Sequence, residues 1–167
     1  MLDPAAAARL NPADTTRVAR ALEVILSTGR ALAKWQEERV GGLGSSIDLR
    51  PIILLPPRDW LYQRCDKRFA LMFAGGAIEE VEALMSRHMN PNLPIMRAIG
   101  VQEIAGYLSG TLTSEQAIAA GQQTTRRYAK RQYTWFAHQP PAEWPRFHEA
   151  LDERNTSAAL ELLHATA

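Results

Sequence analysis

Residues 51–56 read Pro51-Ile-Ile-Leu-Leu-Pro56, four consecutive apolar residues closed at both ends by proline. A short apolar run bounded in this way is typical of a β-strand that is buried on both faces, as in a parallel sheet. We therefore expect a strand at Ile52–Leu55. The alternative is an extended apolar loop lying on helices, because short apolar runs are weak indicators of structure.

No other segment of the sequence is a convincing strand, and one strand cannot satisfy its own backbone donors and acceptors. Either this strand pairs with another chain, or its sheet lies in sequence outside these 167 residues. The exposed strand edge could also recruit a protein partner, or a second copy of the chain, by strand addition. The fold class expected from the residues is mainly α with one short strand.

Apolar residues recur at helical spacing on both sides of this strand. Arg58–Ala74 has the pattern of an amphipathic helix that ends at Gly75-Gly76. Upstream, Asn11-Pro12 resembles an N-cap followed by proline at the first helical position, and Gly29 can end that helix.

A long helix is expected to begin at Thr113 and Gln116, which form a capping box. Within it, residues 124–136 read Thr-Thr-Arg-Arg-Tyr-Ala-Lys-Arg-Gln-Tyr-Thr-Trp-Phe. At about 100° per residue four cations share one face of this helix; they are Arg126, Arg127, Lys130 and Arg131. Like charges at i, i+4 repel, so we expect an anionic partner, with a phosphate backbone as the leading candidate.

The alternative is a solvated basic face on an ordinary amphipathic helix. Four aromatic residues surround the cations, and each can be a core anchor or a platform on which a base stacks. They are Tyr128, Tyr133, Trp135 and Phe136.

The composition is that of a globular protein, with 46% apolar and 22% charged residues. The net charge is +1, so any affinity for nucleic acid must come from local patches. Cys65 is the only cysteine, which excludes an intrachain disulfide and a cysteine-rich zinc site. The sequence shows neither an apolar run of membrane-spanning length nor the regions of a signal peptide, so we expect a cytoplasmic protein with no membrane partner.

A complete active site is missing from these residues. The sequence contains no G-x-x-x-x-G-K-[ST] phosphate-binding loop. Gly41-Gly42-Leu43-Gly44 is glycine-rich, but no strand is expected before it and no Lys-Ser/Thr follows. The histidines lack ligand spacing, so no metal ligands are expected.

A series of short motifs in a fixed order resembles a known family, although each motif alone is weak evidence. In chain order they are Leu2-Asp3-Pro4, Asp14 to Val24, Thr28-Gly29, Leu61-Tyr-Gln-Arg64, Arg68, Met72, Glu79-Glu80-Val81, Leu84, Arg97-Ala-Ile-Gly100, Glu103, Tyr107-Leu108, Gly110, Thr125-Arg126, Tyr128-Ala-Lys-Arg-Gln132 and Thr134-Trp135. Over these residues the chain resembles the C-terminal half of bacterial tRNA dimethylallyltransferases, also called tRNA isopentenyltransferases.

The resemblance implies an activity. The family transfers a dimethylallyl group from dimethylallyl diphosphate, with Mg²⁺, to the exocyclic amine of the tRNA adenosine 3′ of the anticodon. The expected partner is the tRNA anticodon stem-loop. The alternative function is that of a non-catalytic, RNA-binding helical module, which the basic helix by itself suggests.

The resemblance also implies a fold, the C-terminal part of a P-loop NTPase-like α/β fold whose sheet is largely missing. The family's nucleotide-binding P-loop and its catalytic aspartate belong to the N-terminal half. We therefore expect this chain to be inactive alone and to need that half as a partner. The expected segments are 1–46 from the tRNA-gripping insertion, 47–138 from the transferase core with a tRNA-contacting helix, and 139–167 as a tail with a short helix.

The resemblance assigns site residues position by position. Arg64 matches the arginine that faces the diphosphate, and Arg68 is a second, supporting candidate. Three stretches match tRNA-contacting positions: Thr16, Arg17, Val18, Ala19 and Arg20; Arg97, Ala98, Ile99, Gly100, Val101 and Gln102; and Arg126, Lys130, Arg131, Gln132, Thr134 and Trp135. Val101 departs from the family, which usually has Tyr there.

Overall fold

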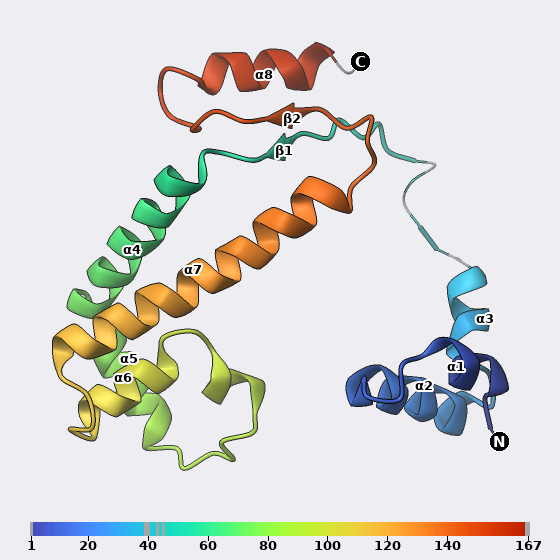
Figure 1. Ribbon diagram of the computed structural model, residues 1–167, viewed down its shortest axis with the longest axis horizontal. Helices are drawn as coiled ribbons and strands as arrows, with labels where there is room; N and C mark the ends of the chain where they lie inside the picture. Colours follow the sequence, from blue (N-terminus) through green and yellow to red (C-terminus); the bar gives the residue numbers. More distant parts are fainter. Residues whose placement is uncertain (1, 39–40, 43, 45, 166–167) are drawn as a thin grey trace. The chain divides into compact units, whose positions relative to one another are not determined.

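The computed structural model is mostly helical and describes residues 2–38, 41–42, 44 and 46–165 (Figure 1). The chain divides into two compact units, Met1–Leu49 and Arg50–Ala167. Leu43, within the glycine-rich stretch considered above, lies outside the described residues. Within the described ranges no helix combines the length and the apolar character needed to cross a membrane.

The first unit consists of short helices. They are α1 (Pro4–Arg9), α2 (Thr15–Thr28) and α3 (Leu32–Glu37). Between α1 and α2 an apolar hollow is lined by side chains of both helices, among them Ala6, Val18 and Leu22.

Asp14 is the N-cap of α2, and its carboxylate accepts a hydrogen bond from the Arg17 amide at 3.1 Å. The predicted start at Asn11-Pro12 is wrong, because the Asn11 side chain accepts from the Ala13 amide in a turn that precedes the helix. The predicted end is confirmed: Gly29 follows the last turn with a φ of 68°, which favours glycine.

The second unit contains the remaining elements. In chain order they are β1 (Ile53–Leu54), α4 (Arg58–Ala74), α5 (Ala77–Met85), the 3₁₀ helix η1 (Pro94–Arg97), α6 (Val101–Leu108), α7 (Ser114–His138), β2 (Arg146–Phe147) and α8 (Thr156–Ala165). The helix predicted at Arg58–Ala74 and the capping box of Thr113 and Gln116 are both confirmed. Helix α4 descends from the sheet, α7 returns alongside it, and α5 and α6 pack at the far end (Figure 1).

The strand predicted at Ile52–Leu55 is confirmed as β1, but the prediction that it is the one strand of the chain is wrong, because it pairs in parallel with a second strand, β2. The Ile53 amide donates to the carbonyl of Pro145 at 2.9 Å, and the Leu55 amide donates to that of Phe147 at 2.8 Å. Burial on both faces is also wrong: Ile53 and Leu55 are 5% and 4% exposed, whereas Leu54 between them is 44% exposed. The face that carries Ile53 is covered, whereas the opposite face is covered only in part, since Phe147, the partner of the exposed Leu54, is 5% exposed.

Arg146 organises the proline-rich segment that brings β2 to β1. Its guanidinium donates to four carbonyl oxygens, those of Pro140, Pro141, Ala142 and Trp144. The shortest of these bonds is 2.7 Å, to Trp144. A guanidinium carries five N–H donors in a fixed fork, so one side chain can satisfy several carbonyls that no helix or sheet pairs.

The prediction that β1 recruits a partner by strand addition is constrained by this pairing. Strand β2 occupies one edge of β1, so an added strand would have to use the other edge. Self-association through β1 stays a prediction.

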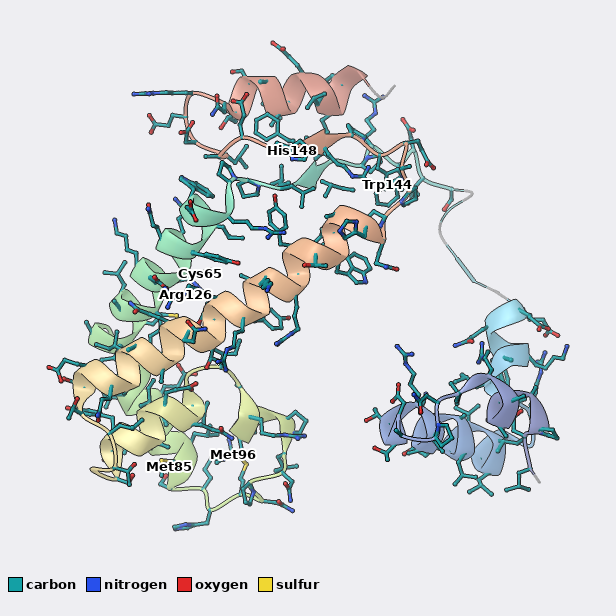
Figure 2. All side chains as sticks on the ribbon, in the orientation of Figure 1. Cys65, Met85, Met96, Arg126, Trp144 and His148 are labelled. Carbon is teal, nitrogen blue, oxygen red and sulfur yellow. The ribbon has the colours of Figure 1, made fainter. Side chains whose placement is uncertain are left out.

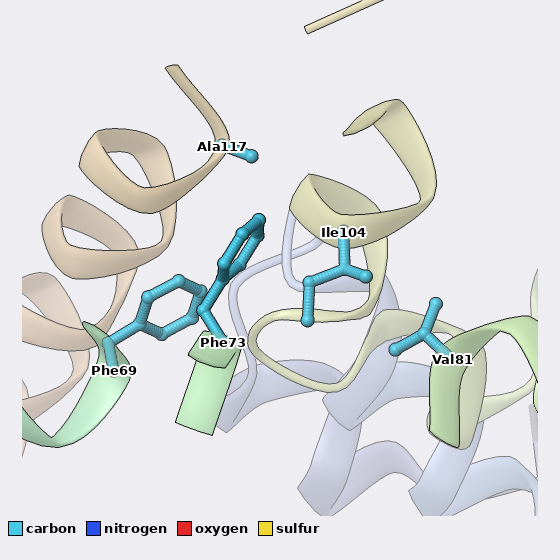
Figure 3. Close-up of a cluster of buried hydrophobic side chains, with 5 residues drawn as sticks. All are labelled: Phe69, Phe73, Val81, Ile104 and Ala117. Atoms are coloured by element: carbon cyan, nitrogen blue, oxygen red, sulfur yellow. The ribbon is translucent and has the colours of Figure 1, made fainter. Parts of the chain in front are cut away.

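The core of the second unit lies where α4 meets α5, α6 and α7 (Figure 3). Phe69 and Phe73 of α4 are its largest members, joined by Val81, Ile104 and Ala117. Burying one such aromatic ring stabilises the fold by about 1.5–3 kcal/mol.

Helix α7 meets α4 through small side chains. A buried residue recurs every fourth position, namely Ala117, Gly121, Thr125 and Ala129. The fit is tightest at Gly121, where a β-carbon would lie 1.9 Å from Cζ of Phe69. The absence of a side chain at Gly121 is therefore what lets the Phe69 ring lie against the α7 backbone.

Replacing Gly121 by alanine should destabilise the second unit. Alanine favours a helix over glycine by about 1 kcal/mol, but overpacking a core costs about 1–3 kcal/mol. The overlap involves a wedged aromatic ring, so we expect the steric cost to exceed the gain and the midpoint of urea unfolding to fall. Gly42→Ala is the control, since a β-carbon there meets nothing within 4 Å. Unchanged or raised stability of the Gly121→Ala protein would contradict this packing.

Candidate functional site

The outward face of α7 presents an open hollow lined by cations and one indole ring. Its lining residues are Arg127, Lys130, Arg131, Thr134, Trp135, His138 and Gln139. Trp135 is 56% exposed, although a large aromatic side chain gains free energy when it is buried. An exposed ring among cations suits a ligand that combines negative charge with flat aromatic surfaces.

Of the four α7 cations predicted to share one face of the helix, Arg126 does not line this hollow. Its Nη1 lies 2.9 Å from Oδ2 of Asp66 in α4, and its Nη2 donates to Gln123. Figure 2 shows Arg126 lying towards Cys65, the neighbour of Asp66. The ion pair with Asp66 directs the Arg126 guanidinium to the partner helix, and the side chain is only 36% exposed.

The aromatic residues of α7 divide into two groups. Tyr133 is half-buried; its hydroxyl donates to the carbonyl of Leu55 at 3.4 Å, and the guanidinium of Arg58 lies 4.8 Å from its ring centroid. Trp135 and Phe136 are exposed and meet edge to face, with centroids 5.0 Å apart. Tyr133 therefore serves the fold, and Trp135 is open to a ligand.

The exposed Tyr128 shares its side of α7 with Arg131, whose guanidinium lies 5.5 Å from the Tyr128 ring centroid. Nearby, Gln132 is exposed, and the Thr134 hydroxyl donates back to the Lys130 carbonyl at 3.0 Å.

The stretch 97–102 forms the entry to α6. Arg97 ends η1 and is exposed, as is Gln102 in the first turn of α6. Gly100 is buried with a φ of 99°, and Val101 is half-buried. Ala98 and Ile99 are exposed at the rim of an apolar hollow that reaches Phe69. Only Arg97 and Gln102 thus offer exposed polar side chains in this stretch.

In the first unit, the stretch Thr16–Arg20 forms the start of α2 and is exposed throughout. Arg17 pairs with Asp14 at 3.3 Å, and Arg20 pairs with Glu23 at 3.5 Å. Such exposed ion pairs contribute little to stability, so either guanidinium can exchange its carboxylate for a phosphate at small cost.

Helix α4 carries a second cationic hollow. Arg64, Lys67 and Arg68 line it together with the apolar side chains Leu61, Leu71 and Met72. The guanidinium of Arg64 lies 4.7 Å from the ring centroid of Trp60, one turn earlier on the helix. Trp60 was not among the predicted site residues, although an aromatic residue four positions before an arginine is a signal the sequence contains.

Cys65 lines the same hollow but is not prepared as a nucleophile. Burial raises the pKa of its thiol, an effect that the nearby Arg68 only partly opposes. The reactive form of a cysteine is the thiolate, so a raised pKa keeps the group protonated and inert at neutral pH.

A metal site is absent from the part of the chain that the structure describes. In those ranges no group of three or more His, Cys, Asp and Glu side chains converges. Mg²⁺ prefers carboxylate oxygens and substrate phosphates, so these residues do not fit an Mg²⁺ site of their own.

A comparison with protein families matches residues 1–139 to the IPP transferase family. The chain is 64% identical over 149 residues to a tRNA dimethylallyltransferase of Sphingopyxis alaskensis, a match that covers 89% of this chain and 49% of the relative. It is 56% identical over 162 residues to a tRNA dimethylallyltransferase of Novosphingobium aromaticivorans, covering 96% of this chain and 58% of that one. The chain thus spans about half the length of these curated relatives.

Solved structures give a similar result. The full-length tRNA isopentenylpyrophosphate transferase of Bacillus halodurans superposes with a TM-score of 0.60 at 33% identity, covering 98% of this chain and 48% of that one. A tRNA isopentenylpyrophosphate transferase from Staphylococcus epidermidis superposes with a TM-score of 0.58 at 28% identity, covering 99% and 52%.

Proposed function

This chain belongs to the IPP transferase family, and from that premise we propose that it contributes to tRNA modification. The reaction transfers a dimethylallyl group from dimethylallyl diphosphate to the exocyclic amine of the tRNA adenosine 3′ of the anticodon. The observation that carries the proposal is the chemistry of the two cationic hollows in the second unit, one on α7 beside Trp135 and one on α4 beside apolar side chains.

The α7 hollow suits the RNA substrate. Arg127, Lys130 and Arg131 can each neutralise a phosphate of the anticodon stem-loop, and the exposed ring of Trp135 can stack on a base. Arg97, Gln102 and the α2 arginines Arg17 and Arg20 add further exposed polar contacts. Arg126 contributes least to this surface because Asp66 already holds its guanidinium.

The α4 hollow suits the donor, which is an anion at one end and an apolar chain at the other. Arg64, Lys67 and Arg68 match the diphosphate, and Leu61 and Leu71 match the dimethylallyl group. The carbon–oxygen bond to the diphosphate breaks as the amine attacks, so negative charge grows on the leaving group. Arg64, held over the ring of Trp60, is placed to stabilise that charge.

The 167 residues contain no phosphate-binding loop of the P-loop type. We propose that the fold is the C-terminal part of a P-loop NTPase-like fold, and that activity also needs the P-loop, the catalytic base and the Mg²⁺ ligands of the other half. Arg64 and Arg68 act on the diphosphate itself, and their proposed roles require no metal ligand from this chain. The proposed site of action is the cytoplasm, where tRNA is found.

The test of the activity is prenyl transfer to an anticodon stem-loop RNA. We expect no transfer by this chain alone, and transfer when the N-terminal half of the Sphingopyxis alaskensis relative is co-expressed with it. Turnover by the chain alone would refute the need for a second half. A folded, purified pair without transfer would refute the activity.

Arg64→Ala in the reconstituted pair should lower kcat by about 100-fold, the scale expected when one group that stabilises developing charge is removed. Arg64→Lys should recover only part of the loss, because an ammonium cannot stack on Trp60 as a planar guanidinium does. The affinity for RNA should be unchanged, since Arg64 is assigned to the donor. Arg154→Ala, an exposed arginine near α8, serves as the control. A normal kcat for Arg64→Ala would remove this residue from the donor site.

RNA binding can be measured on this chain by fluorescence anisotropy at several salt concentrations. Replacing Arg127, Lys130 and Arg131 with alanine should weaken binding and flatten the plot of log K against log salt by about 0.7–0.9 per lost phosphate contact. Arg126→Ala should change this slope far less. If Arg126→Ala lowered the slope as much as a substitution of Arg127, Lys130 or Arg131, Arg126 would belong to the same RNA-binding surface as these three cations.

The same measurement, combined with the transfer assay, distinguishes the enzyme from the alternative, a non-catalytic RNA-binding module. A chain that binds RNA with this salt dependence, but supports no transfer in the reconstituted pair, is a non-catalytic RNA-binding module. The exposed cationic hollow of α7 is the observation that favours this alternative.

A further inference from the structure

We propose that Glu103 is a positioning residue, which holds the stretch 97–102 against α7 so that Arg97 and the α7 cations bind one RNA together. The inference rests on the proposed function, because the ligand is the same RNA. It concerns a side chain that touches neither the RNA nor the donor in the proposal above.

The geometry of Glu103 joins two segments of the chain. Its Oε2 accepts a hydrogen bond from the Gly100 amide at 3.1 Å, and its Oε1 accepts one from the Thr124 hydroxyl at 2.8 Å. Gly100 lies three residues after Arg97, and Thr124 lies one turn before Arg127. One carboxylate therefore connects both RNA-facing segments of the second unit.

This arrangement differs from an ordinary capping box. In that motif the N-cap side chain bonds to the N3 amide while the N3 carboxylate bonds to the N-cap amide. Gly100 is the N-cap of α6 and has no side chain to complete the motif. The second oxygen of Glu103 bonds to a different helix, so its hydrogen bonds reach beyond the end of α6.

Gly100 is also confined by its packing. A β-carbon at this position would lie 3.3 Å from Cε2 of Phe69, and the φ of 99° is one that other residues rarely adopt. Phe69 in turn lies against Gly121 of α7. The Glu103 bridge and the Phe69 contact thus act on the same turn, and both fix it relative to α7.

Removing the Glu103 carboxylate has opposite expected effects on RNA affinity, depending on whether its charge or its positioning role matters more. A carboxylate close to a phosphate-binding surface repels the ligand, so deletion of its charge alone would tighten RNA binding. Loss of positioning would weaken binding, because Arg97 would have to be ordered at the moment of association. The sign of the change therefore separates the two accounts.

The decisive test is a substitution at Thr124. Replacing its hydroxyl removes one of the two hydrogen bonds to Glu103 without changing any charge. We expect Thr124→Val to weaken binding of an anticodon stem-loop RNA by about tenfold, the scale of one lost hydrogen bond to a charged group. The salt slope should fall by about 0.7–0.9, as one phosphate contact is lost. Thr124→Ser keeps the hydroxyl and should retain both the affinity and the slope.

A double-mutant cycle assigns the effect to Arg97. Arg97→Ala should weaken binding in the unsubstituted chain but have little further effect in the Thr124→Val chain, because the contact is already lost there. Hydrogen exchange at the Gly100 amide should accelerate in Glu103→Ala without RNA present. Circular dichroism should show that α6 and α7 remain helical in each variant.

Several results would overturn the inference while leaving the proposed function intact. These are additive effects of Arg97→Ala and Thr124→Val, unchanged RNA affinity of Thr124→Val, or tighter RNA binding by Glu103→Ala. Absence of RNA binding by the unsubstituted chain would instead refute the proposed RNA contact, and the inference would fall with it.

Discussion

The second unit depends on the contact between the Phe69 ring and the bare backbone of Gly121. Glycine within a helix costs about 1 kcal/mol relative to alanine, whereas burying a phenylalanine ring contributes about 1.5–3 kcal/mol. The contact therefore favours folding despite the weak helix former. It sets how closely α4 and α7 approach, and Phe69 also reaches Gly100 at the entry to α6.

Because the inner faces of α4 and α7 are used in this way, most of their cations lie on the outer faces, whereas Arg126 of α7 is paired with Asp66 of α4. Arg64 and Arg68 line one hollow, and Lys130 and Arg131 line another. The α4 cations are exposed beside apolar side chains, which would suit an amphiphilic diphosphate. The α7 cations are exposed beside Trp135, which would suit a nucleic acid. In the proposed function, the same packing that closes the core separates the donor site from the RNA site.

Much of the candidate site could be predicted from the spacing of residues close together in the sequence. The helix bounds of α4 and the i, i+4 relation of Arg64 and Arg68 follow from periodicity alone, and the motif series led to the family that the comparisons show. The pairing of Arg126 could not be predicted because its partner, Asp66, lies 60 residues away in the chain. Strand β2 was missed because a run of two residues is too short to show the alternation of a strand.

The sequence alone determined the family, most of the long helices and the candidate cations, since these follow from the order of residues and from spacings within one or two helical turns. Only the tertiary structure decided which cation is held by a carboxylate, which face of β1 is covered, and that Glu103 connects α6 with α7. The physical reason is that ion pairs, strand pairing and close packing join residues far apart in the chain, and their partners become defined only when the helices come together.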